Sequence, residues 1–84
     1  MTPPVELLPR DLAIGEYTYA QIYRSHTNGG GRAVYLRNSL PGEATGHQFH
    51  VFAIDVIDGR EQLGETLAVR HNCDQAISIA GQAP

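Results

Sequence analysis

The 84-residue sequence carries a net charge of −3, and 42% of its residues are hydrophobic and 18% charged. This balance is typical of a folded chain and excludes a long disordered one, and the length suits one domain rather than two. We therefore expect a single domain over residues 1–84, with frayed ends at residues 1–4 and 81–84, where proline, glycine and small residues collect.

Charge and cysteine content limit the partners and the compartment. All six lysine or arginine positions are arginines, and the acidic balance argues against general nucleic-acid binding, which needs a positive surface. Cys73 is the only cysteine, so an internal disulfide is excluded and a reducing cytoplasm is favoured. The sequence lacks the basic and apolar regions of a signal peptide and any apolar run near the ~20 residues of a membrane span. We expect a cytoplasmic protein without membrane contact.

The first elements form a predicted hairpin. Residues 5–14 are apolar but interrupted by Pro9, which predicts an irregular lead-in or a short edge strand. Residues 16–25 carry tyrosines at alternate positions, which is typical of a strand. Asn28-Gly29 then predicts a two-residue type I′ turn into a strand over residues 32–38.

The length of this turn decides which side chains share a face. With two residues in the turn, one face holds Tyr17, Tyr19, Gln21, Tyr23, Val34 and Leu36. The opposite, outward face then holds Ala20, Ile22, Arg24, Tyr35 and Arg37. A loop one residue longer exchanges the partners between the two faces.

The second half of the chain contains a second hairpin signal. After a loop over residues 39–46 with Pro41-Gly42 at its turn, residues 48–57 are apolar on both sides and predict a central strand covered on both faces. Asp58-Gly59 predicts the next tight turn. Residues 62–71 favour the return strand, and their helix-forming residues leave a helix open as the alternative. Residues 76–80 alternate Ile77 and Ile79 and predict a short last strand.

These elements predict an all-β fold, a small barrel or sandwich of five to six short antiparallel strands built on two hairpins. If residues 62–71 are helical, the fold becomes α+β.

The histidines offer one candidate catalytic site. His47 and His50 resemble a metal chelate, but residues three apart in a strand point to opposite faces, so we expect no metal site and no cofactor. His50, Glu65 and His71 instead share one otherwise apolar face of the second hairpin, where an imidazole oriented by a carboxylate could act as a general base. The ordinary alternative is that these imidazoles bind backbone groups or titrate in water, and we favour no catalytic residue.

The candidate binding residues lie on the outward face of the first hairpin. Arginine and tyrosine are enriched at interface hot spots, and the set comprises Arg24, Tyr35 and Arg37, with His26 and Arg32 beside the glycine-rich tip. An acidic end at Asp55, Asp58, Glu61 and Glu65 complements this face. The sequence therefore favours a small non-catalytic binding protein that associates with itself or with another protein. The alternatives are a small enzyme using His50, Glu65 and His71, and a small-molecule-binding barrel whose cavity Tyr17, Tyr19 and Tyr23 line.

Overall fold

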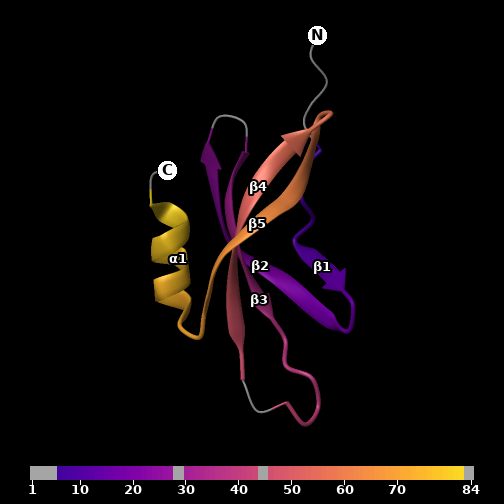
Figure 1. The fold of residues 1–84 in the computed structure, drawn as a ribbon, viewed down its shortest axis with the longest axis vertical. Helices are drawn as coiled ribbons and strands as arrows, with labels where there is room; N and C mark the ends of the chain where they lie inside the picture. Colours follow the sequence, from indigo (N-terminus) through magenta and orange to yellow (C-terminus); the bar gives the residue numbers. More distant parts are fainter. Residues whose placement is uncertain (1–5, 28–29, 44–45, 83–84) are drawn as a thin grey trace.

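A computed structural model describes residues 6–27, 30–43 and 46–82, and within these ranges it contains five strands and one helix (Figure 1). The strands are β1 (Asp11–Ile14), β2 (Tyr17–Thr27), β3 (Gly30–Arg37), β4 (Gln48–Ile57) and β5 (Arg60–Arg70), and the helix is α1 (Cys73–Gly81). All strand pairs are antiparallel and follow the chain order β1-β2-β3-β4-β5. The sheet curls into a half-barrel, so the predicted small all-β fold is confirmed.

Both hairpin predictions concern tight turns. Asp58 and Gly59 have φ angles of 54° and 76°, and Ile57 pairs with Arg60 on either side of them. These positive φ values are the ones that a type I′ turn requires, so this turn is confirmed. Asn28-Gly29 lies outside the described residues, and the flanking strands pair Thr27 with Gly30. The expected fraying of residues 1–4 also falls outside them.

A β-bulge in β2 overturns the predicted faces of the first hairpin. The expected register holds from the turn to Tyr23, which pairs with Val34, but beyond Ile22 it shifts by one residue and Gln21 pairs with Tyr35. One extra residue moves every later side chain to the other face. The face of Tyr35 was also expected to point outward, and this is wrong because Tyr35 is fully buried.

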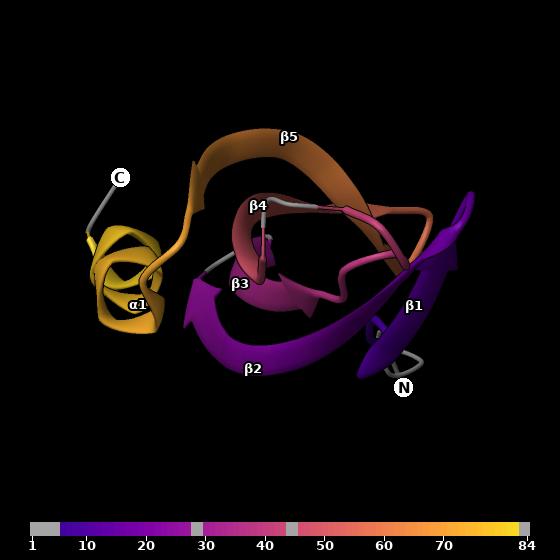
Figure 2. The same ribbon diagram turned by 90° about the horizontal axis from the view of Figure 1, so that it is seen from below.

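The sheet has a core on each face. The inner face, enclosed by the curl, buries Tyr19, Ala33, Tyr35, Phe52 and Ile54. The outer face buries Val34 and Val51 under Ala76 and Ala80 of α1. Figure 2 shows the helix at one side of the curled sheet and β1 at the other. The strand expected to be covered on both faces, β4, is therefore confirmed as central.

Residues 76–80 are helical, so the strand predicted there is wrong, whereas β5 confirms the predicted return strand over residues 62–71. Asn72 caps the helix, because its side-chain oxygen accepts a hydrogen bond from the backbone N–H of Gln75 at 3.1 Å. Ala76 and Ala80 are one helical turn apart and face the sheet, where their small size permits close packing. No helix in the described part of the chain is long and apolar enough to cross a membrane.

The segment before β1 closes one end of the half-barrel. Glu6 forms a parallel bridge with Arg60, accepting a hydrogen bond from the N–H of Glu61 and donating one to the carbonyl of Gly59, both at 2.8 Å. Pro9 predicted an irregular lead-in or a short edge strand, and both are present, because the irregular segment is followed by the short edge strand β1. We call this segment before β1, residues 6–10, the strap. The end of the sheet that carries the loop between β3 and β4 lies away from the strap.

Candidate functional site

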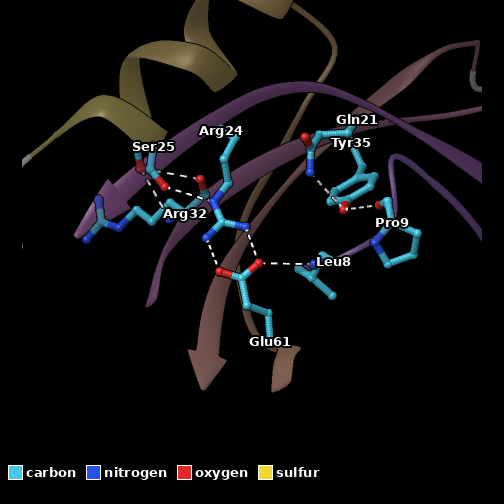
Figure 3. Close-up of polar contacts among 8 residues, drawn as sticks. All are labelled: Leu8, Pro9, Gln21, Arg24, Ser25, Arg32, Tyr35 and Glu61. Carbon is cyan, nitrogen blue, oxygen red and sulfur yellow. Dashed lines mark hydrogen bonds and ion pairs between the residues drawn. The ribbon is translucent and has the colours of Figure 1, made fainter. Parts of the chain in front are cut away.

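Arg24, the first of the candidate binding residues, forms a buried ion pair on the inner face (Figure 3). Its Nη1 donates to Oε1 of Glu61 at 2.6 Å and its Nη2 donates to Oε2. The side chains are only 11% and 4% exposed, and Glu61 also accepts the backbone N–H of Leu8 at 3.0 Å. Arg24 thus joins β2 to β5, and Glu61 does not belong to an exposed acidic end as the sequence suggested.

Two further candidates, Tyr35 and Arg32, also bind groups of the chain itself, and Figure 3 shows the contacts of Tyr35. The hydroxyl of Tyr35 donates to the carbonyl of Pro9 at 2.8 Å and accepts from Nε2 of Gln21 at 3.0 Å. Burial raises the pKa of Tyr35, which keeps this hydroxyl protonated and able to donate. Arg32 donates through Nη1 to the carbonyls of Ile79 and Gln82, at 3.0 and 2.9 Å, and so binds the C-terminal end of α1.

The remaining two candidate binding residues are His26 and Arg37. The side chain of His26 lies outside what the structure describes. Arg37 ends β3 on the inner face, where its guanidinium lies over the ring of Tyr17, with Cζ 4.0 Å from the ring centroid. Its Nη2 donates to Oε1 of Glu43 at 2.9 Å. Among the described side chains of the predicted binding set, Arg37 is the one whose ion-pair partner belongs to a loop.

The candidate catalytic residues do not form one described cluster. The His50 ring lies on the inner face, edge-on to Tyr19 at 5.4 Å between centroids and stacked on Phe52 at 5.9 Å. Glu65 is exposed, and Nδ1 of His71 lies 3.2 Å from the carbonyl oxygen of His47. Within the described ranges no hydrogen bond or ion pair joins the three, and no group of metal-ligating side chains gathers. Glu65 lies within a register shift of β5, between the Phe52–Thr66 and Ile54–Leu63 pairs, where the simple alternation is broken, whereas His50 pairs with Val69 beyond the shifts.

The three tyrosines expected to line a cavity are divided between the faces. Tyr17 and Tyr19 belong to the inner core, whereas Tyr23, beyond the bulge, packs with the outer core next to α1. The bulge at Ile22 is again the cause.

A hollow that the sequence analysis missed lies at the strapless end of the sheet. Its volume is about 470 Å³, and its lining residues are Asp11, Leu12, Ala13, Thr18, Tyr19, Ala20, Leu36, Asn38 and His47. Ala20 pairs with Asp11 on one side and Leu36 on the other, so these three lie in one row across β1, β2 and β3 on the outer face. Ala13 pairs with Thr18 in the next row. The alanines have no side chain long enough to fill the surface between their larger neighbours.

No family model, curated protein or solved structure matches this chain. Its function therefore has to be argued from the geometry alone. A second hollow, of about 510 Å³, lies between β5 and α1 and is lined by Arg70, Asp74, Gln75, Ser78 and Ile79. Because four of these five side chains are polar or charged, the hollow at β1–β3 is the more apolar site and fits a small-molecule pocket better.

The buried ion pair should tolerate loss of both charges better than loss of one. In Arg24→Met, the carboxylate of Glu61 stays buried but loses its paired charge, and we expect the free energy of unfolding to fall by about 3–5 kcal/mol. Adding Glu61→Gln should restore part of this loss, because the neutral amide still accepts that N–H. Urea unfolding of the single and double variants measures both values, and strictly additive losses would contradict this account.

His50 should make stability depend on pH near neutrality. Burial, and next the positive charge of Arg37, lowers the pKa of His50 below its ordinary 6.5. The unfolded chain therefore takes up a proton at a higher pH than the folded one, so this contribution is present above about pH 6.5 and is lost as the pH falls below it. We expect the urea midpoint to drop between about pH 7.5 and 5.5.

Two variants isolate this effect. His50→Phe keeps an aromatic ring but cannot titrate, so its midpoint should change less over the same pH interval. His47→Gln removes an exposed histidine and should behave like the original protein. An unchanged pH dependence in His50→Phe would show that another group is responsible.

Proposed function

We propose that this chain is a small, non-catalytic binding protein that takes an apolar molecule bearing a hydrogen-bond donor. The supporting observation is the hollow of about 470 Å³ on the outer face of β1, β2 and β3. Its volume falls within the roughly 300–1,000 Å³ of small-molecule sites. Alanine and leucine side chains supply the apolar part of the lining. The proposed location is the cytoplasm, where a lone thiol such as Cys73 stays reduced.

The polar groups around the hollow suggest how a ligand is oriented. Asp11 and Asn38 lie at the hollow with Thr18 and His47. The Oδ1 of Asn38 already accepts the backbone N–H of Thr18 at 2.9 Å, so Asn38 holds the loop in place. The carboxylate of Asp11 is an acceptor, which favours a ligand that carries an amine or hydroxyl hydrogen. A small set of polar groups beside an apolar surface is the usual design of such sites.

Filling the hollow should abolish binding without harming the fold. Ala20 is exposed and central in the lining, so the ring in Ala20→Phe would occupy the space that the ligand needs. With N-phenyl-1-naphthylamine, an apolar fluorescent amine, we expect binding to the original protein and at least tenfold weaker binding to this variant, about 1.4 kcal/mol.

The control is Gln62→Phe, which adds the same ring at an exposed position of β5 outside the hollow and should leave binding unchanged. Equal binding by Ala20→Phe and the original protein would place the dye elsewhere, and no fluorescence change with the original protein would reject this ligand class.

Self-association is a second candidate, supported by the surface of β5. This strand is last in the sheet order, and its Leu67 and Val69 are 38% and 39% exposed. Apolar side chains on an edge strand favour pairing with another chain, and two identical edges permit a twofold-symmetric dimer.

Light scattering during size exclusion should then give twice the chain mass of 9.1 kDa. Leu67→Lys should return the mass to that of one chain, because the new charge resists burial in the interface. Leu7→Lys makes the same change at an exposed position outside β5 and should remain dimeric. A single-chain mass for the original protein at high concentration would remove this candidate.

A further inference from the structure

Arg37 has two hydrogen-bond donors on one edge of its guanidinium, and its partner Glu43 accepts from one of them. The side chain is 14% exposed, and its planar guanidinium offers two donors, Nε and Nη2, along one edge. Nη2 donates to Oε1 of Glu43 at 2.9 Å, whereas Nε is buried and has no hydrogen-bond partner among the described residues. A carboxylate that met this edge squarely would accept from both nitrogens. Glu43 leaves one of these donors unsatisfied.

Glu43 reaches this position from a loop and not from the sheet. Its backbone N–H donates to the carbonyl of Leu40 at 3.0 Å across Pro41-Gly42, and Gly42 has a φ of 83°. Proline followed by a glycine of positive φ is typical of a type II turn, which directs Glu43 back toward the sheet. The second carboxylate oxygen, Oε2, accepts the hydroxyl of Tyr17 at 2.8 Å. The Glu43 side chain can therefore leave Arg37 without breaking a strand pairing.

The surroundings of the edge are aromatic. Tyr17 lies under the guanidinium, and this cation–π contact holds the Arg37 plane in place. His50 and Tyr19 follow on the same inner face, with ring centroids 5.4 Å apart. Because burial, and next the positive charge of Arg37, lowers the pKa of His50, Arg37 provides the positive charge here. A carboxylic acid that entered here would contact the guanidinium of Arg37 beside the aromatic rings of the inner face.

We propose that Arg37 and Tyr17 form a binding site for a small aromatic carboxylate, and that Glu43 is its built-in, displaceable occupant. The ligand's carboxylate accepts hydrogen bonds from both Nε and Nη2 of Arg37 and replaces Glu43 as the acceptor of Nη2. The ligand's ring packs against the inner-face aromatic side chains. Arg37, Tyr17 and Glu43 do not line the apolar hollow, so the test of this site is independent of the dye experiment.

The test removes the resident carboxylate and supplies benzoate. In Glu43→Ala, we expect benzoate to bind at least tenfold more tightly than to the original protein, measured by NMR titration of the Arg37 Nε–H signal, which should shift as that hydrogen gains an acceptor. Glu65→Ala removes the same charge from an exposed site on β5 and should bind like the original protein. Binding by Glu43→Ala no tighter than by Glu65→Ala would overturn the proposal.

Further variants and ligands test the chemistry of recognition. Adding Arg37→Met to Glu43→Ala should abolish binding, and adding Arg37→Lys should weaken it about tenfold or more, because an ammonium cannot offer a two-donor edge. Benzamide, which has the ring without the charge, and acetate, which has the charge without the ring, should both bind at least tenfold more weakly than benzoate. Persistent binding without Arg37, or equal affinity for either analogue, would overturn the assignment.

Where Glu43→Ala does not fold, Glu43→Gln provides the same test, since it removes the charge but keeps the volume of the side chain. It should also bind benzoate more tightly than Glu65→Ala does. Thermal unfolding with and without benzoate gives a second readout, because a ligand that binds only the folded state raises the melting temperature. The absence of both effects in Glu43→Gln would reject the site.

Discussion

The ion pair between Arg24 and Glu61 is the interaction on which the curl of the sheet depends. It joins β2 to β5, strands that are not neighbours in the sheet, and the same carboxylate holds the lead-in segment through the N–H of Leu8. An almost fully buried carboxylate is costly unless its charge and oxygens are satisfied, so β2, β5 and the lead-in must come together for this pair to be stable. Once they do, the inner face is enclosed and Tyr35 can bind Pro9.

The sheet divides the buried apolar residues into two small cores, one on each face. The inner core lies within the curl, and α1 supplies the cover for the outer one through Ala76 and Ala80. Arg32 connects these parts, because it extends from β3 to the carbonyls at the end of the helix. The arginines predicted to serve an exposed surface therefore largely serve the fold: each long side chain spans a gap that the few apolar residues of a short chain cannot fill.

Features of the fold that depend on neighbouring residues were predicted well from the sequence. Features that depend on contacts between distant segments were not. Asp58-Gly59 identified its turn because backbone conformation there depends on those two residues. The bulge at Ile22 has no local signature, yet it reversed the faces of half a hairpin. The helix was missed because Ile77 and Ile79 alternate over too short a window, although Asn72 followed by Asp74 is a typical helix start. The hollow and the Arg37 cluster combine residues from several segments, so no single stretch could reveal them.

The two ion pairs of the inner face use the same chemistry in different structural settings. Glu61 belongs to a strand, is 4% exposed, and could leave Arg24 only if β5 and the lead-in separated. Glu43 belongs to a loop, is 18% exposed, and leaves one donor of Arg37 unsatisfied. The first pair is thus tied to the free energy of folding, while the second is tied only to the position of a loop. This difference is why ligand exchange is proposed at Arg37 and not at Arg24.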